Sequence, residues 1–560
     1  MTITDPAVLE RLRADATRWL SDDPDAGDRA ELSRVLDGLP GTTDELADRF
    51  AGPLTFGTAG LRGPLRAGPN GMNLAVVRAA AAGLVGWLAE RGADGPLVIG
   101  YDARHRSREF AEQTARVATG AGRQALLLPR PLPTPILAYA VRSLGAAAGV
   151  MVTASHNPPQ DNGYKVYLGA ALGGVTGAGA QIVPPADAEI EAAIRAIGPL
   201  DRVPLGPPGT VLGEDVLASY LDSVTGVVAP DGPRDLAVAY TPLHGVGGPV
   251  VLAALPAAGF PAPSIVEVQA EPDPEFPTVS FPNPEEPGAI DRAVALASST
   301  GSDLAIANDP DADRCAVAVP DGDGWRMLRG DEVGVLLADH LMRRGVRGLY
   351  ATTIVSSSLL GAVCRGRGMP YAETLTGFKW IVRASGDGGL VYGYEEALGY
   401  CVAPELVRDK DGISAALLIC ELAAALKADG RTLLDRLDEI AAEFGVYATD
   451  QLSVRVEDLS EIGSAMARIR QRPPATLLGE PVTSIEDLLP EADVVTLRTS
   501  STRVVVRPSG TEPKLKAYLE VTEAVAGDEA VAGDGVPAAR RRATAALVTL
   551  RTETAAALGV

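Results

Sequence analysis

A serine in a proline-rich turn has the clearest chemical potential in the chain. Ser155 shortly follows the apolar run Ala147–Val152, which predicts a buried strand. The next segment, Asn157–Pro159, excludes a continuing strand or an immediate helix, because proline lacks the backbone donor and fixes φ. We therefore expect an exposed, rigidly aimed Ser155 hydroxyl among unpaired backbone N–H groups, which suits a phosphoryl group. The pair Ser155 and His156 alone would indicate only an ordinary polar turn.

Three aspartates at alternate positions follow another buried-strand pattern. In extended chain, Asp309, Asp311 and Asp313 would share one face. Three converging carboxylates need a cation, and oxygen ligands select Mg²⁺ or a similar hard ion. An EF-hand is excluded, because its Gly and Glu positions are Arg314 and Pro320; a plain acidic turn is the alternative. We expect the arginine to contact an anion in front of the metal, and a phosphate oxygen on the serine could complete the metal's shell.

A third turn carries groups that suit a phosphate. It lies between two β-branched segments and supplies a guanidinium, two hydroxyls and an ammonium, from Arg507, Ser509, Thr511 and Lys514 around Gly510. Arginine offers planar bidentate contacts to phosphate, and glycine allows close backbone approach. A plain hairpin would not need basic residues at both ends, so we favour a phosphate cradle.

A glycine-bounded loop carries two further carboxylates, Glu395 and Glu396. They could accept hydrogen bonds from sugar hydroxyls, although a solvated acidic turn fits nearly as well. Lys379 and Lys410 lie in neighbouring segments and could serve a phosphate or proton transfer. Spacing alone does not distinguish these roles from surface charge.

Length and charge limit the function classes. A chain of 560 residues is too long for one core and indicates three to five domains. With 46% apolar and 22% charged residues, it reads as soluble and globular. The net charge of −22 argues against nucleic acid and anionic membranes as partners. An anionic small molecule would therefore need a locally basic site.

The cysteines indicate a reducing compartment, and the histidines give no indication of a zinc site. The four cysteines lack paired spacing and are expected to be core thiols of a cytoplasmic protein. The four histidines show no metal-ligand spacing. We expect no signal peptide, because the N-terminus lacks a basic region followed by an apolar run. No apolar stretch approaches 18 residues, so we expect no membrane span.

Hydrophobic periodicity predicts helices that alternate with short strands, typical of parallel sheets covered on both faces. The first fifty residues indicate an acidic helical lead-in, and Gly198–Gly209 a linker. We expect helices over Leu74–Arg91, Arg108–Ala121, Ala186–Ala196, Gly247–Ala258, Asp331–Arg344 and Ile413–Ala428, and strands over Leu97–Tyr101, Gln124–Leu128, Leu236–Tyr240, Ser264–Val268, Leu304–Ala307 and Gly348–Thr353.

The C-terminal part differs from the rest. Its expected strands, Asp450–Val456 and Arg503–Val506, alternate with other segments, and residues 524–535 form a near-duplicate polar stretch that we interpret as a mobile loop insertion. The expected fold class is α/β. Three similar mixed-sheet units and a smaller C-terminal α+β domain divide the chain at residues 1–205, 206–324, 325–440 and 441–560.

Taken in order, the four motifs resemble the α-D-phosphohexomutase superfamily, which includes phosphoglucomutases and phosphomannomutases. The resemblance covers about residues 50 to 525. Phe56–Gly63, together with the segment holding Thr376, Gly377 and Lys379, is similar to the branch with phosphopentomutase and glucose-1,6-bisphosphate synthase. The resemblance implies four domains around a central cleft, one motif from each.

The resemblance also implies roles for individual residues. Ser155 would carry a phosphoryl group and complete the Mg²⁺ site of the three aspartates, and Lys165 would lie near the transferring phosphate. Arg62, Arg314 and Lys410 match positions that contact substrate or assist proton movement. Glu395 matches the sugar-hydroxyl acceptor. The family loop often has serine where this chain has Ala397, so one sugar contact is absent.

These parts predict a phosphosugar mutase acting on glucose or mannose phosphates, in which positioning and charge neutralisation dominate. Phospho-Ser155 would donate to a sugar monophosphate held at Arg507–Thr511, and the bisphosphate would turn end for end before its other phosphate is taken back. A sugar 1,6-bisphosphate would serve as activator. The alternatives are a phosphopentomutase, a phosphatase, which is disfavoured because water must be kept from phosphoserine, and a catalytically silent sugar-phosphate-binding protein. We expect a monomer or homodimer.

Overall fold

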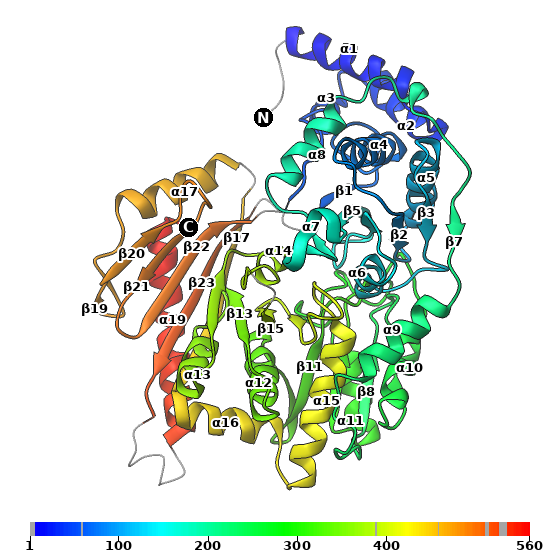
Figure 1. The fold of residues 1–560 in the computed structure, drawn as a ribbon. Coiled ribbons are helices and arrows are strands. Elements are labelled where there is room, and N and C mark those ends of the chain that lie inside the picture. Colours follow the sequence, from blue (N-terminus) through cyan, green and yellow to red (C-terminus); the bar gives the residue numbers. More distant parts are fainter. Residues whose placement is uncertain (1–5, 58–59, 387–388, 457–458, 510–513, 526–534) are drawn as a thin grey trace.

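The computed structural model describes residues 6–57, 60–386, 389–456, 459–509, 514–525 and 535–560. Four larger sheets follow one another along the chain (Figure 1). Helices flank all of them, so the expected α/β class with four domains is confirmed.

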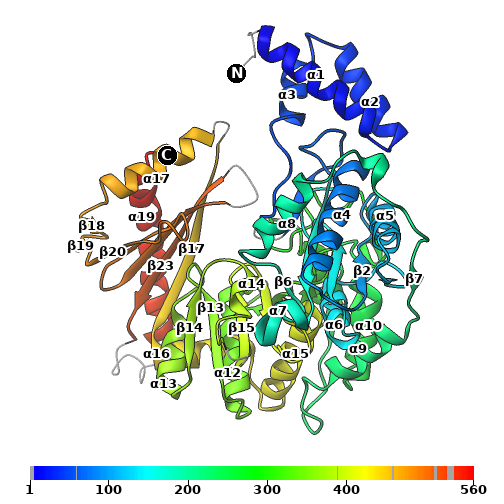
Figure 2. The same cartoon turned by 45° about the horizontal axis from the view of Figure 1, so that its top comes forward.

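The N-terminal segment forms a small helical layer, as its sequence predicts. Its helices are α1 (Pro6–Asp22), α2 (Ala26–Asp37) and α3 (Thr43–Arg49). Asp25 caps α2 by accepting hydrogen bonds from the backbone N–H groups of residues 27 and 28. Leu32 and Leu46 pack with Ala67 of the following domain in a small core. The layer lies at the outer edge of the first domain (Figure 2).

The first large sheet has the order β1-β5-β4-β2-β3-β7, with β6 paired to β5. Its strands are β1 (Leu61–Pro64), β2 (Leu97–Tyr101), β3 (Ala125–Leu127), β4 (Ala148–Val152), β5 (Asp161–Leu168), β6 (Ala180–Gln181) and β7 (Thr210–Val211), and its helices are α4 (Leu74–Glu90), α5 (Ser107–Gly120), α6 (Thr134–Ser143), α7 (Ala170–Gly177) and α8 (Ala186–Arg195). Strand β2 pairs in parallel with both β3 and β4. The segments that leave β2 and β4 therefore emerge at the same edge of the sheet.

The second sheet has the order β12-β11-β10-β8-β9. Its elements are β8 (Val238–Thr241), β9 (Ser264–Ile265), β10 (Leu304–Ala307), β11 (Ala316–Asp321), β12 (Gly324–Met327), α9 (Asp215–Thr225), α10 (Gly248–Ala257) and α11 (Asp291–Thr300). The predicted strand Ser264–Val268 is shorter, because a 3₁₀ turn over Glu267–Gln269 replaces its end. Strands β10 and β11 are antiparallel, and the three aspartates lie in their connection.

The third sheet has the order β14-β13-β15-β16. Its elements are β13 (Leu349–Thr353), β14 (Tyr371–Thr374), β15 (Leu390–Glu395), β16 (Gly399–Cys401), α12 (Gly330–Arg343), α13 (Leu359–Arg367), α14 (Phe378–Ile381), α15 (Gly412–Ala428) and α16 (Leu433–Phe444). Strand β15 ends at Glu395, and the turn to β16 carries Glu396.

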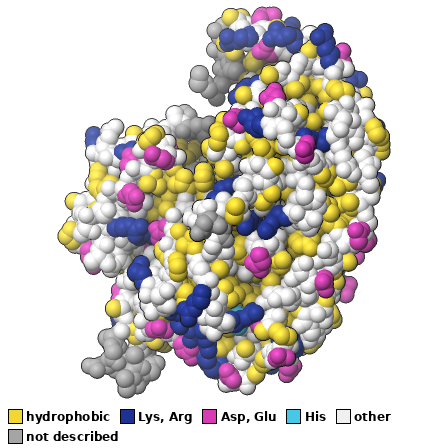
Figure 3. Space-filling view, viewed as in Figure 1, with side chains coloured by type: hydrophobic (Ala, Val, Ile, Leu, Met, Phe, Trp, Pro, Cys, Tyr) yellow, Lys and Arg dark blue, Asp and Glu magenta, His cyan; other side chains and the backbone are white. Residues whose placement is uncertain are grey.

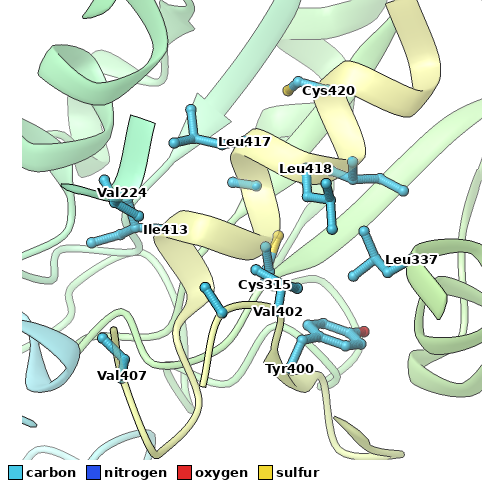
Figure 4. Close-up of a cluster of buried hydrophobic side chains, with 14 of the residues drawn as sticks. Val224, Cys315, Leu337, Tyr400, Val402, Val407, Ile413, Leu417, Leu418 and Cys420 are labelled. Atoms are coloured by element: carbon cyan, nitrogen blue, oxygen red, sulfur yellow. The ribbon is translucent and has the colours of Figure 1, made fainter. Parts of the chain in front are cut away.

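A single hydrophobic core links the first three domains. Residues of α6, of the second sheet and of α15 belong to the same buried cluster. Figure 4 shows Ile413, Leu417 and Leu418 of α15 between Val224 of α9 and Leu337 of α12. All four cysteines are buried free thiols, which confirms the expectation of core thiols. The shared core fixes the loops of these three domains relative to one another.

The fourth sheet is antiparallel, with the order β17-β23-β22-β21-β20. Its elements are β17 (Val446–Arg455), β20 (Ser484–Asp487), β21 (Val495–Arg498), β22 (Thr502–Pro508), β23 (Lys514–Glu523), α17 (Leu459–Gln471) and α19 (Gly535–Leu558), with a small hairpin of β18 (Thr476–Leu477) and β19 (Glu480–Pro481). It has its own core. Most of the polar segment 524–535 lies outside the described residues.

The surface carries dispersed charge on the face that Figure 3 shows. Among the described helices, none combines the length and the apolar character that a membrane crossing requires. On the face shown in Figure 3, acidic side chains form small separate groups rather than one patch. The net negative charge is therefore dispersed on that face.

Candidate active site

Ser155 lies in the turn after β4, as expected, but it is not exposed. Only 1% of the residue is accessible, because the second domain packs over it. Its hydroxyl donates to Asp309 Oδ2 at 2.7 Å and lies 3.1 Å from His156 Nδ1. Its backbone is left-handed, with φ of 53°, a conformation that costs a non-glycine residue about 1–2 kcal/mol. Its N–H donates to Thr153 Oγ1 at 2.8 Å.

The three aspartates converge, but not through an extended chain. Asp309, Asp311 and Asp313 each offer an oxygen within 4.8 Å of the others. The segment is a turn, in which Ala312 has φ of 52° and its N–H donates to the carbonyl of Asp309 at 2.8 Å. The convergence was predicted correctly, whereas the strand geometry assumed for it is wrong.

The carboxylates fit a metal ion on the evidence of their unused oxygens. Asp311 Oδ1 and Asp313 Oδ1 are buried and have no hydrogen-bond partner. Their other oxygens are occupied, because Lys165 Nζ donates to Asp311 Oδ2 at 2.8 Å and to Asp313 Oδ2 at 3.0 Å, and Thr134 Oγ1 donates to Asp311 Oδ2 at 2.6 Å. Burial and the other two carboxylates raise the pKa of Asp309. A buried carboxylate oxygen without a donor is costly, and a cation would remove that cost.

Three cations surround the aspartates. Besides Lys165, Lys410 Nζ lies 3.2 Å from Asp313 Oδ2, and Arg314 Nε lies 3.9 Å from Asp309 Oδ2. Burial opposes the charged forms, but the neighbouring carboxylates outweigh it and raise the pKa of all three side chains. These three side chains offset the charge of the three aspartates, so the site is not strongly acidic.

His156 and Arg62 complete the surroundings of the serine. Burial, Arg314 and Arg62 lower the pKa of His156 well below its usual value, so its ring is neutral near pH 7. Arg62 Nη1 donates to Asn157 Oδ1 at 3.1 Å, while its buried Nε has no partner. Burial lowers the pKa of Arg62, although a guanidinium stays charged.

The two glutamates of the third domain face different surroundings. Burial raises the pKa of Glu395, with Lys410 and Arg314 acting against it, so Glu395 belongs to the charged cluster. Glu396 Oε2 instead accepts from Ser356 Oγ at 3.1 Å and lines a cavity of about 350 Å³. That cavity lies between the second, third and fourth domains.

The expected phosphate cradle is only partly within the described chain. Arg507 is the last residue but one of β22, and Ser509 N–H donates to the carbonyl of Lys514 at 2.8 Å. Gly510 and Thr511 lie outside the described residues. Burial and the carboxylate of Glu396 raise the pKa of Tyr518, with Arg507 acting against them. Tyr518 lines the same cavity as Glu396.

The segment holding Thr376, Gly377 and Lys379 approaches the cluster indirectly. The ring of Phe378 lies 5.5 Å from Lys410 Nζ. Burial lowers the pKa of Lys379, which the carboxylate of Asp187 in α8 partly offsets. No contact within the described part of the chain joins Lys379 to the three aspartates.

Several residues that support the site escaped the sequence reasoning. Thr134, at the start of α6, holds Asp311 by both its hydroxyl and its N–H. Asp409 accepts from Tyr167 Oη at 2.7 Å and from Gln181 Nε2 at 2.9 Å, which ties the segment before Lys410 to the first domain. These contacts join different domains, so no local sequence pattern predicts them. The one available signal is that parallel strands end at the same edge of a sheet, which brings the segments after them together.

Asp331, in α12, gives a pH-dependent prediction. Burial raises its pKa to about 7, and its Oδ1 accepts from Ser357 N–H at 2.7 Å and Tyr394 Oη at 3.0 Å. At this position the folded protein then binds more protons than the unfolded chain between about pH 4 and pH 7, so the contribution of Asp331 to stability falls across that window as pH rises, by at most roughly 1.4 kcal/mol per unit. Asp331→Asn should flatten this slope in urea midpoints measured from pH 4 to 8. An unchanged slope would contradict the assignment.

Comparisons with known proteins agree with this arrangement. Four family models match the chain in order: the phosphoglucomutase/phosphomannomutase α/β/α domains I, II and III over residues 53–200, 218–322 and 329–444, and the C-terminal domain over residues 452–532. A "probable phosphomannomutase" of Haemophilus influenzae is 47% identical over 459 residues, covering 80% of this chain and 93% of its own. A phosphoglucomutase of Staphylococcus aureus is 34% identical over 85% of this chain and 91% of its own.

Another relative is named after a different sugar. A "probable phosphoribomutase" of Schizosaccharomyces pombe is 34% identical over 90% of this chain and 92% of its own. Among solved structures, a Thermus thermophilus protein provisionally named a phosphomannomutase has a TM-score of 0.68 and 27% identity, over 88% of this chain and 98% of its own. The chain belongs to the phosphoglucomutase/phosphomannomutase family, within the α-D-phosphohexomutase superfamily.

Proposed function

We propose that the protein is a phosphosugar mutase that interconverts the 1-phosphate and 6-phosphate of glucose, mannose or both. The observation that carries the proposal is the contact of Ser155 Oγ with Asp309 Oδ2 at 2.7 Å, beside two buried carboxylate oxygens without donors. A hydroxyl and a cation site in this relation suit phosphoryl transfer, in which positioning and charge neutralisation dominate.

The transfer itself uses the charged cluster around the serine. In the proposed cycle the bond between phosphorus and Ser155 Oγ breaks as a bond to a sugar hydroxyl oxygen forms, and the proton of that hydroxyl passes to Glu395, its proposed hydrogen-bond acceptor. In the reverse step Ser155 Oγ takes the second phosphate, and the proton returns to the sugar oxygen that is released. Lys165, Arg314 and Lys410 offset the negative charge of the phosphoryl group, and Arg62 offers a buried Nε to it. His156, neutral near pH 7, holds a hydrogen bond with the serine oxygen.

Asp309, Asp311 and Asp313 would hold Mg²⁺, which supplies Lewis-acid charge neutralisation at the phosphate. Glu395, buried beside Lys410 and Arg314, is the proposed acceptor for sugar hydroxyls. The turn Arg507–Lys514 would bind the distal phosphate. A sugar 1,6-bisphosphate would prime Ser155.

The runner-up is a phosphopentomutase. It is favoured by the relative named a phosphoribomutase and by Ala397, which lacks the hydroxyl that the family loop often carries. A monomer or homodimer in the cytoplasm remains a prediction, and light scattering tests its first part.

A substrate panel decides between the sugars. We expect kcat/KM for glucose 1-phosphate or mannose 1-phosphate to exceed that for ribose 1-phosphate by at least tenfold, with a bisphosphate activator present. Ala397→Ser should widen this ratio by up to about tenfold, the effect of one added hydrogen bond to a hexose. Preference for ribose 1-phosphate would instead establish the pentomutase. Net phosphate release without isomerisation would contradict both.

A further inference from the structure

The loop Asp102–Arg106, between β2 and α5, contains a buried arginine that faces the turn of Ser155. Arg104 is 4% exposed. Its Nη2 donates to the carbonyls of Ser155 at 2.7 Å and Asn157 at 2.5 Å, and its Nη1 to those of Pro158 at 2.7 Å and Asp161 at 3.2 Å. One planar guanidinium thus satisfies four carbonyls of a single turn, which no other side-chain type could do.

Arg104 is itself held by Asp102 and by the ring of Phe276. Asp102 Oδ1 accepts from the Arg104 backbone N–H at 3.0 Å and from Ser107 Oγ at 2.6 Å, and Asp102 Oδ2 lies 3.4 Å from Arg104 Nε. The guanidinium also lies over the ring of Phe276 in the second domain, 5.0 Å from its centroid. A buried side chain with this many fixed contacts has one orientation.

The neighbours of Arg104 anchor the same loop to other parts of the molecule. His105 Nε2 lies 2.5 Å from Glu275 Oε1 in the second domain. Arg106 pairs with Asp25 and Asp28 of the N-terminal helical layer. That layer precedes residue 53, where the family models begin to match. The loop therefore joins three parts of the molecule at the turn that carries the serine.

We propose that Arg104 is a positioning residue, which sets where the Ser155 oxygen lies relative to the three aspartates. The inference rests on the proposed function, because it concerns the aim of the transferring oxygen. Ser155 is left-handed, and the four carbonyl bonds hold the turn in that conformation. A misplacement of about 1 Å in a reacting group can cost roughly 10²-fold in rate.

The test compares Arg104→Lys and Arg104→Met. Lysine keeps the positive charge but cannot reach four carbonyls, so positioning predicts that both variants lose about 100-fold in kcat while KM stays within about threefold. The partition of the phosphoenzyme, meaning the ratio of phosphoryl loss to water over transfer to sugar, should also rise in both variants. Intact mass recorded with and without sugar phosphate measures it.

Arg123 provides the matched control. It lies in the same domain and donates to the carbonyls of Gly95 at 2.7 Å and Ala93 at 3.0 Å, away from the serine turn. Arg123→Lys and Arg123→Met should keep kcat and the partition of the phosphoenzyme. Equal losses in the control variants would overturn the proposal in favour of a general loss of stability.

Two further outcomes are decisive. Near-normal kcat in Arg104→Lys with loss in Arg104→Met would show that charge, not positioning, is what Arg104 supplies. If both Arg104 variants are insoluble, Asp102→Asn replaces them in the test. This change keeps the size of the side chain at residue 102 but weakens its ion pair with Arg104. An unchanged kcat and partition of the phosphoenzyme in Asp102→Asn would overturn the proposal. Failure of the mutase function itself is distinguishable, since the wild-type protein would then show neither isomerisation nor a phosphoenzyme.

Discussion

Ser155→Ala is expected to lower kcat for 1-phosphate to 6-phosphate conversion by at least about four orders of magnitude, the scale seen when the group that carries a covalent intermediate is removed. The buried hydroxyl makes few other contacts, so the fold should persist. Loss of its 2.7 Å hydrogen bond to Asp309 leaves a buried acceptor without a donor and should cost about 1–3 kcal/mol of unfolding free energy. A coupled assay for the 6-phosphate product and a urea unfolding curve measure the two effects separately.

Intact mass provides the second readout for this variant. Wild-type protein incubated with a sugar 1,6-bisphosphate should gain one phosphoryl group, and Ser155→Ala should gain none. Ser302 is a suitable control, because it is also buried and its hydroxyl lies 2.7 Å from Thr300 Oγ1 outside the site. Ser302→Ala should retain activity and phosphorylation. Turnover of Ser155→Ala within tenfold of the wild-type rate would rule out the phosphoserine cycle.

Local sequence patterns predicted the bounds of an element correctly where tertiary contacts did not extend it. Strands β2 and β10 have the predicted bounds, Leu97–Tyr101 and Leu304–Ala307, because short apolar runs between turn residues have one way to be buried. Strand β17 begins at Val446, four residues before the predicted Asp450, since it pairs with β23 along its whole length. That pairing is a tertiary contact which no local pattern encodes.

The convergence of the three aspartates was predicted from the sequence, but the burial of the site was not. The sequence places Ser155 in a turn, and only the packing of the second domain against the first brings Asp309 onto its hydroxyl. In the turn at the aspartates Ala312 has a left-handed conformation, which an alanine does not predict. Arg104 carried no motif at all. Its role emerges because β2 and β4 are parallel neighbours whose ends meet.

Removing the metal should stop the reaction, and replacing Asp311 should reproduce that loss. Chelator-treated protein is expected to lose turnover and to regain it with Mg²⁺. Asp311→Asn removes one of three negative charges and leaves Lys165 with a weaker partner, so kcat should fall by at least about 10³-fold at any Mg²⁺ concentration. A ligand at a hundred times its Kd stabilises the folded state by about 2.7 kcal/mol. The wild-type protein should show a shift of that size with Mg²⁺, and Asp311→Asn should show little.

Asp339 separates this effect from the loss of any buried aspartate. It is fully buried, and its carboxylate accepts from Arg436 at 2.8 Å and pairs with Arg367 at 3.0 Å, in the third domain. Asp339→Asn should lower the unfolding free energy by a few kcal/mol, because Arg436 and Arg367 each lose one of their two carboxylate partners and keep only Glu439 and Glu443. It should nevertheless keep the Mg²⁺-dependent stabilisation and the Mg²⁺ dependence of kcat. The opposite result is that neither chelator nor Mg²⁺ changes the turnover or the urea midpoint of the wild-type protein. It would show that Lys165, Lys410 and Arg314 neutralise the three carboxylates without a metal ion. The unpartnered oxygens of Asp311 and Asp313 argue for the cation, because those three side chains leave both oxygens without a donor.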